Sequence, residues 1–234
     1  MTEAPAPRSR SKLRISALIA AILLSAIAAA IGWITVGDTG GCTPDTPSMF
    51  SRVYHISSEA MQPEIEPGDW IWAERRFYCL QAPARGDLAV LAVPSRPETI
   101  FVERVIGLPG DRVQLQQGQL YLNGEPVRRD WVESAIHTGE GGDTSQRTRY
   151  MEMLPGERRY AIDVADPEGP LENTGEVTVP DGQYFVLGDN RDRSEDSRSA
   201  GFGLVPRGAI ADRPAMVLWS GDRNRIGLRL DAAP

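Results

Sequence analysis

The sequence predicts a mostly β domain, closed or folded over itself, carried on one N-terminal transmembrane helix. Composition favours the β class, because 18 Pro and 23 Gly among 234 residues are typical of a loop-rich, strand-rich fold. Patterning agrees, since after residue 50 the apolar residues fall in short runs that Gly and Pro interrupt, without convincing helical periodicity. One long uncharged run near the N-terminus predicts the anchor. The length suits one anchored domain with a sizeable core.

The anchor is expected at Ile15 to Val36, an uncharged run rich in Ala, Ile and Leu that is long enough to cross a bilayer. The tail of residues 1–14 is basic, and Asp38 is the first charge after the run. The positive-inside rule therefore predicts a single-pass membrane protein with its N-terminus in the cytoplasm and its main domain on the outer face. The alternative is a cleaved secretory signal. Small residues at 28–30 suit cleavage, but the apolar region of a signal is normally about 7–15 residues long.

Charge and cysteine content narrow the classes of partner. The net charge is −7 although the tail is basic, so the remainder is strongly acidic, which argues against nucleic acid as a partner. Cys42 and Cys79 would lie in an oxidising compartment, where they either pair or remain free thiols. Their spacing fits neither a metal site nor a redox motif. We therefore expect no metal and no cofactor.

The main domain, residues 51–234, follows a turn-rich linker at 37–50. Gln-Gly at 117–118 and Asn-Gly at 123–124 predict two tight turns, the first inside a hairpin. The polar stretch 129–157 contains Gly, Thr and Ser and predicts an insertion or a mobile loop. Short strands are expected at residues 53–57, 70–75, 88–93, 100–106, 111–116, 119–122, 160–164, 175–179, 184–187 and 215–220.

The strand expected at 100–106 places a carboxylate among apolar side chains. Alternation along a strand puts Phe101, Glu103 and Val105 on one face and Arg104 on the other. A carboxylate on an apolar face is costly unless it is paired with a cation or open to water. The environment of Glu103 therefore decides whether this residue is structural or functional.

Four aromatic residues between positions 70 and 78 have two interpretations. Trp70, Trp72, Phe77 and Tyr78 have a spacing that suits a membrane interface. Trp70 and Trp72 also share one face of the expected strand at 70–75, which suits core packing. The sequence leaves both interpretations open.

Four motif stretches follow one another in a recognisable order. Residues 58–63 read Ser-Glu-Ala-Met-Gln-Pro, 85–87 Arg-Gly-Asp, 103–111 Glu-Arg-Val-Ile-Gly-Leu-Pro-Gly-Asp, and 188–198 Gly-Asp-Asn-Arg-Asp-Arg-Ser-Glu-Asp-Ser-Arg. Over about residues 51–220 this order resembles bacterial signal peptidase I, a family of serine–lysine proteases. The resemblance implies a β-rich domain with an inserted β subdomain, at about residues 112–183, held at the outer (periplasmic) face of the inner (cytoplasmic) membrane. It also implies a substrate class, the signal peptides of exported pre-proteins.

The chain departs from the family at both catalytic positions. Ala60 stands directly before Met61, where the family has its serine nucleophile, and Glu103 stands directly before Arg104, where the family has its lysine base. A methyl group cannot attack an amide. The single lysine of the chain, Lys12, lies in the tail. The resemblance therefore implies a signal-peptidase-like protein that lacks the usual nucleophile and base.

The resemblance assigns further roles around these two positions. Ser58 matches a residue that helps to hold the oxyanion, although a strand-end serine that bonds its own backbone is the simpler interpretation. Ser194 matches the serine that orients the lysine, or is a turn residue. The site implied by the resemblance comprises Ser58, Met61 and Pro63 as peptide-groove residues and Arg104, Asp189, Ser194, Asp196 and Arg198 as supporting residues.

The charge at residue 103 predicts a change of ion pairing. Asp196 and Arg198 match a salt-bridge pair of the family, but Arg198 or Arg104 would instead hold the carboxylate of Glu103. A paired Glu103 is structural. If no arginine reaches it, burial raises its pKa and makes it a functional candidate.

We expect a membrane-anchored, catalytically inactive relative that binds signal peptides, exported or membrane-tethered polypeptides, or an active sister peptidase. Two other classes stay open. One is an active endopeptidase with a non-standard nucleophile or base, and the other is a structural envelope protein. The candidate groups for a non-standard mechanism are Ser57, Ser58, a carboxylate pair of Glu59 and Glu103, His55 and His137.

Overall fold

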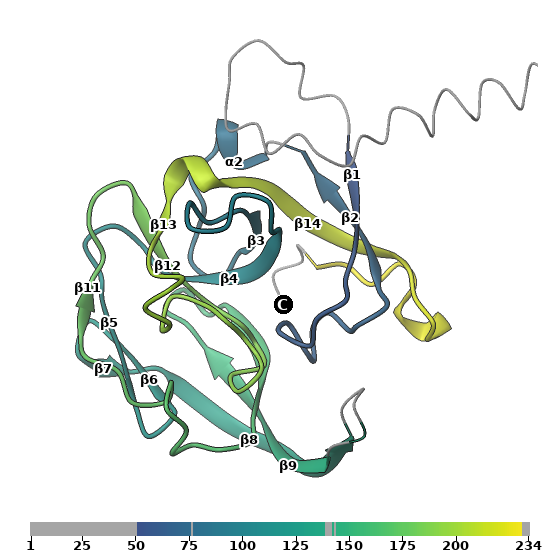
Figure 1. Cartoon of the computed structure of the whole chain (residues 1–234). Coiled ribbons are helices and arrows are strands. Elements are labelled where there is room, and N and C mark those ends of the chain that lie inside the picture. Colours follow the sequence, from purple (N-terminus) through teal and green to yellow (C-terminus); the bar gives the residue numbers. More distant parts are fainter. Residues whose placement is uncertain (1–50, 76, 139–141, 143, 231–234) are drawn as a thin grey trace, which may run out of the picture. The chain divides into compact units, whose positions relative to one another are not determined.

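The computed structural model describes residues 51–75, 77–138, 142 and 144–230, which form a mostly β fold, as predicted (Figure 1). The predicted tail, transmembrane run and linker, at residues 1–50, lie outside the described residues. Within the described ranges, no helix is both long enough and apolar enough to span a bilayer. The strands belong to three sheets, of seven, four and three strands.

The seven-stranded sheet contains Glu103 and Arg104, and its strands lead into the segments that carry Ala60 and the loop 188–198. Its neighbouring strands are all antiparallel. The last of the described strands lies between two strands formed early in the sequence, so it connects them in one sheet. The order is β1 (Arg52–His55), β2 (Trp70–Glu74), β14 (Ile210–Trp219), β3 (Leu88–Leu91), β4 (Phe101–Gly107), β12 (Gln183–Leu187) and β13 (Val205–Pro206).

The two smaller sheets are built from chain between β4 and β12. The four-stranded sheet has the order β11 (Val177–Thr178), β5 (Arg112–Gln116), β6 (Gln119–Leu122) and β7 (Glu125–Pro126). The three-stranded sheet has the order β10 (Arg159–Val164), β9 (Thr144–Met153) and β8 (Arg128–Thr138). Short helical turns complete the described elements: α2 (Phe77–Leu80), η1 (Arg207–Ala209) and η2 (Arg223–Arg225).

The prediction of a loop at residues 129–157 was wrong, because most of this stretch forms the long antiparallel hairpin of β8 and β9 (Figure 1). The described side chains of β8 are almost all exposed. A strand with both faces towards water needs no apolar alternation, so its polar sequence hides the period of two that identifies a strand. The hairpin register also shifts between Trp131 and Glu133, which breaks the pattern further.

The conformations of two turns and one strand irregularity fit the residues found there. Gln117-Gly118 and Asn123-Gly124 all have positive φ, as the predicted tight turns require. The strand predicted at 215–220 is longer, since β14 already begins at Ile210. Its register shifts just after Pro214, and such an irregularity is where a sheet tolerates a residue without an N–H.

In the described part of the chain, buried apolar side chains form three clusters, and β4 touches all of them. Val105 belongs to the cluster that includes Phe202. Ile106 belongs to the cluster around Leu115, and Val102 packs against the third. Successive residues of β4 thus point to different clusters, which confirms the predicted alternation. Both faces of β4 are covered, so a polar side chain in its middle lies in the interior.

The four aromatic residues differ in exposure. Tyr78 in α2 is fully buried, and its hydroxyl donates to the Leu88 carbonyl at 2.8 Å. Trp70, by contrast, is 43 % exposed and lies in register with Trp219, which is 54 % exposed. Cys79, also in α2, is disulfide-bonded. Cys42, the other cysteine of the chain, lies outside the described residues.

Candidate functional site at Ala60 and Glu103

The segments predicted to form the site meet around Ala60. Ala60 follows β1, and the loop 188–198 after β12 lies directly against it, since the Asn190 N–H donates to the Ala60 carbonyl at 3.0 Å. Gly188 fits there because it has no Cβ, which would lie 2.2 Å from the Cβ of Ser194 and 2.8 Å from the Ala60 oxygen. Glycine at 188 therefore lets the loop pack on both residues.

Glu103 lies in the middle of β4 and contacts the same loop. It is 1 % exposed. The Ser194 hydroxyl donates to its carboxylate, with Oγ 3.3 Å from Oε2 and 3.4 Å from Oε1. Ser194 packs on Gly188 beside Ala60, so Ala60, Gly188, Ser194 and Glu103 form one contiguous cluster. Ser194 thus contacts residue 103, as the resemblance implied, but it meets a carboxyl group in place of an amine.

The carboxyl group of Glu103 has no cationic partner within 4.0 Å among the described residues. Burial raises its pKa well above the ordinary value, and the negative charge of Asp196 adds to the rise. The hydrogen bond from Ser194 and the charge of Arg198 act in the opposite direction. The balance favours the protonated acid, which donates a proton and is a poor base.

The prediction that an arginine holds Glu103 was wrong. Arg104 points to the opposite face of β4 and forms a bidentate pair with Asp189, at 2.8 and 2.7 Å. Arg198 is held by Asp196, at 2.8 and 2.7 Å. The Asp196–Arg198 pair that the resemblance implied is therefore present. Strand alternation and a nearer carboxylate explain why neither arginine is available to Glu103.

Other buried acids around the loop do have cationic partners. Arg191 and Glu152 are both fully buried and pair at 2.6 Å, and the Tyr160 hydroxyl donates to Glu152 at 2.5 Å. The guanidinium of Arg104 lies over the Tyr160 ring, 4.4 Å from its centroid. These contacts join the loop to β9, β10 and β4. Glu103 thus has no cationic partner in the described part of the chain, whereas the other buried carboxylates around the loop are paired with arginines.

The residues assigned to a peptide groove have different environments. Ser58 is exposed, just after β1. Met61 is 2 % exposed and belongs to a core cluster, so its side chain serves packing. Pro63 is half-buried and follows a cis peptide bond. The exposed Ser58 hydroxyl is the polar side chain of this set.

Sequence reasoning missed Arg147, which brings the β8–β9 hairpin to the site. Arg147 is 5 % exposed and pairs with Glu59 at 2.9 Å. It also donates to the Gln62 amide oxygen at 2.9 Å. Arg147 therefore binds one residue before Ala60 and one residue after it. A signal was the even spacing of Thr and Tyr at positions 144, 148 and 150, since these residue types favour strands and would share one face.

The two histidines take part in other contacts. The ring of His55 lies 4.9 Å from the ring of Trp70, centroid to centroid. His137 lies in β8, in register with Ser145 of β9. Nowhere in the described ranges are three or more His, Cys, Asp or Glu residues grouped so that they would hold a metal ion.

Comparison with known proteins gives a consistent result. The family described as signal peptidase, peptidase S26, matches residues 46–219. Signal peptidase I of Pseudomonas aeruginosa is 33 % identical over 193 residues, which cover 77 % of this chain and 63 % of that protein. Signal peptidase I of Rickettsia typhi is 40 % identical over 130 residues, or 53 % of this chain and 47 % of that protein. A probable signal peptidase I-2 of Synechocystis is 30 % identical over 184 residues, or 76 % and 67 %.

The chain spans about half to two thirds of the length of these relatives. A crystal structure of a signal peptidase I from Enterococcus faecalis aligns with a TM-score of 0.34 at 28 % identity, over 56 % of this chain and 94 % of that one. The family match covers most of the chain and includes Ala60, Glu103 and the loop 188–198. The chain therefore belongs to the signal peptidase I family, peptidase S26.

Proposed function

We propose that this protein acts in signal-peptide processing as a binding protein without peptidase activity, which holds signal peptides or exported polypeptides at the outer face of the membrane. One observation carries the proposal. Ala60 and Glu103 stand where the resemblance places the nucleophile and the base, and both contact the loop 188–198 that carries Ser194.

The chemistry of cleavage needs a hydroxyl at residue 60 and a neutral amine at residue 103. Ala60 offers a methyl group. Glu103 is buried with a raised pKa, which favours a protonated carboxyl group that cannot accept a proton from a nucleophile. The described domain contains no lysine, because the single lysine of the chain is Lys12. Acyl transfer by the mechanism of the family therefore has neither of its reacting side chains.

The preserved surroundings support binding rather than loss of the fold. Gly188 still packs on Ser194 and Ala60, and the pairs Arg104–Asp189 and Asp196–Arg198 still anchor the segments that carry the dyad positions. A buried ion pair that loses one partner is strongly destabilising, so both partners must be kept together. A site that keeps its frame without its reacting groups is suited to hold a peptide and release it unchanged.

The proposed location rests on the sequence and on one exposed surface. The apolar run at 15–36, preceded by basic residues, is the proposed anchor. Trp70, Trp219 and Leu218 are each more than 40 % exposed and lie at the paired ends of β2 and β14. Exposed tryptophan suits the interface of a bilayer, which supports a domain held close to the membrane.

The test compares binding and cleavage in one preparation. The full chain in detergent micelles is mixed with a pre-protein that carries a small-x-small cleavage site, and with the same pre-protein with bulky residues at that site. We expect saturable binding of the first, weaker binding of the second and cleavage of neither. The double variant Ala60→Ser, Glu103→Lys should then cleave the first, while Ala60→Ser, Glu103→Gln should not. Equal binding of both pre-proteins, or none, would contradict the proposal.

A further inference from the structure

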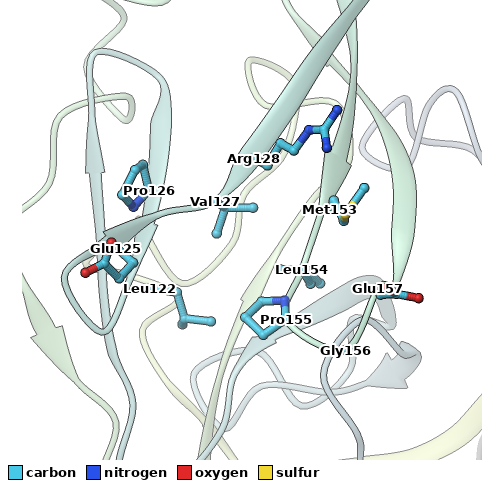
Figure 2. A pocket seen from close by; sticks show the side chains of 10 residues that line it. All are labelled: Leu122, Glu125, Pro126, Val127, Arg128, Met153, Leu154, Pro155, Gly156 and Glu157. Atoms are coloured by element: carbon cyan, nitrogen blue, oxygen red, sulfur yellow. The ribbon is translucent and has the colours of Figure 1, made fainter.

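A cavity of about 360 Å³ opens where β6, β7, β8 and the β9–β10 turn meet. Its volume lies in the range of binding pockets in proteins. Figure 2 shows Leu122, Val127 and Pro155 around its centre. Leu122 and Val127 are core residues, 4 % and 5 % exposed, so the floor is rigid and apolar. None of the residues around this cavity belongs to the site at Ala60 and Glu103.

The rim of the cavity is negatively charged. Glu125 and Glu157 are exposed and stand on opposite sides of the apolar centre (Figure 2). Neither carboxylate forms an ion pair with a described residue. The cation at the rim, Arg128, is already paired with Asp130 at 3.0 Å. The cavity therefore combines an apolar floor with two uncompensated negative charges, which favours a ligand that is apolar in its middle and cationic at both ends.

The cavity borders an edge strand. In the part of the chain that the structure describes, β8 is the terminal strand of its sheet, and it begins at Arg128, a residue of the rim. The unpaired backbone groups of an edge strand can pair with an extended peptide, while a pocket beside the edge selects a side chain. Trp131 and Val132 in β8 are 65 % and 43 % exposed. The occupant that fits both features is an extended polypeptide.

We propose that this cavity is a second binding site, for an extended segment of a partner polypeptide with the pattern basic-x-apolar-x-basic. Side chains two residues apart on an extended chain point to the same face. The apolar side chain enters between Leu122 and Val127, and the basic side chains on either side of it meet Glu125 and Glu157. The site does not depend on the residues at 60 and 103, so its failure and the failure of the proposed function are separate results.

The test follows the Met153 methyl group, which borders the cavity, by NMR of the full chain in detergent micelles with labelled methionine methyls. Met153→Leu identifies its signal among the six methionines. The probe is the peptide acetyl-Arg-Ala-Leu-Ala-Arg-amide. We expect a saturable shift of the Met153 signal. The acidic counterpart acetyl-Glu-Ala-Leu-Ala-Glu-amide should give none, and acetyl-Ala-Arg-Leu-Arg-Ala-amide, with its arginines on the opposite face, should bind more weakly.

A paired variant tests the two carboxylates. Glu125→Gln with Glu157→Gln should weaken binding of the basic peptide by roughly 2- to 30-fold, as expected for the loss of two exposed charge pairs. The matched control Glu98→Gln with Asp181→Asn removes two exposed charges elsewhere and should leave binding unchanged. An unmoved Met153 signal, equal binding of the acidic peptide, or equal loss in both paired variants would overturn the proposal. Equal binding of free butylguanidinium would show a site for small cations instead of a polypeptide.

Discussion

Replacing Glu103 by glutamine tests whether its buried carboxyl group, which has no cationic partner among the described residues, is protonated in the folded protein. Glutamine has nearly the same shape, keeps an oxygen that accepts the hydrogen bond from Ser194, and carries no titrating proton. Glu103 is 1 % exposed, and burial together with the charge of Asp196 raises its pKa well above 4.5. The folded protein therefore keeps a proton that the unfolded chain releases.

The pH dependence of the free energy of unfolding follows from this difference in protonation between the folded and unfolded states. The stability contributed by neutral Glu103 is fully present below about pH 4.5 and is lost as the pH rises to the raised pKa of the folded state. Inside that window the free energy of unfolding falls by up to about 1.4 kcal/mol per pH unit because of this group. Glu64 and Glu172 also have raised pKa values caused first by burial, but they are present in both proteins and cancel in the difference.

The assay is urea unfolding of the full chain in detergent micelles, at a series of pH values from about 4.5 to 8, with Glu98→Gln as an exposed control. The Glu103→Gln variant should gain stability relative to the native chain with every step in pH, and the control should run parallel to the native chain. A difference between native chain and variant that stays constant with pH would refute the reasoning, because Glu103 would then be ionised in the folded protein.

Three further changes test the frame around the site. Arg191→Met leaves Glu152 buried without its cation and should lower the free energy of unfolding by about 3–5 kcal/mol, and adding Glu152→Gln should recover part of it; no recovery would count against the ion pair. Gly188→Ala should cost about 1–3 kcal/mol through the overlap with Ser194 and with the Ala60 carbonyl, and Ser194→Gly should relieve part of it; a tolerated alanine would contradict the close packing. Arg147→Gln should speed hydrogen exchange in residues 59–62, and unchanged exchange would show that the hairpin does not hold that segment.

Much of the fold was predictable because its strands alternate between core and surface. The strand at 119–122 was predicted with its observed ends, and β4 shows the expected alternation. The β8–β9 hairpin was missed because both faces of β8 meet water, so no apolar period marks it. The start of β14 was missed because Pro214, which suggests a break, lies within the strand at a shift of register.

The proximity of the candidate site residues was predicted, but their ion pairing was not. Motif order located Ala60, Glu103 and Ser194, which the structure brings together. It did not tell which carboxylate each arginine holds, since that choice depends on strand faces and on distances across the fold. Arg147 lay in the stretch taken for a loop, so its contact with the segment around Ala60 had no basis in the predicted elements.

The central claim, that the assembled dyad positions hold no working nucleophile, is tested most directly by a cleavage assay of the purified native chain with mass spectrometry of the product ends. The substrate is a pre-protein with a small-x-small site, and Ser57→Ala, Ser58→Ala serves as the comparison. We predict no cleavage at that site by either protein. Cleavage there by the native chain that disappears when Ser57 and Ser58 are replaced would contradict the claim, because one of these hydroxyls would then perform the attack that Ala60 cannot.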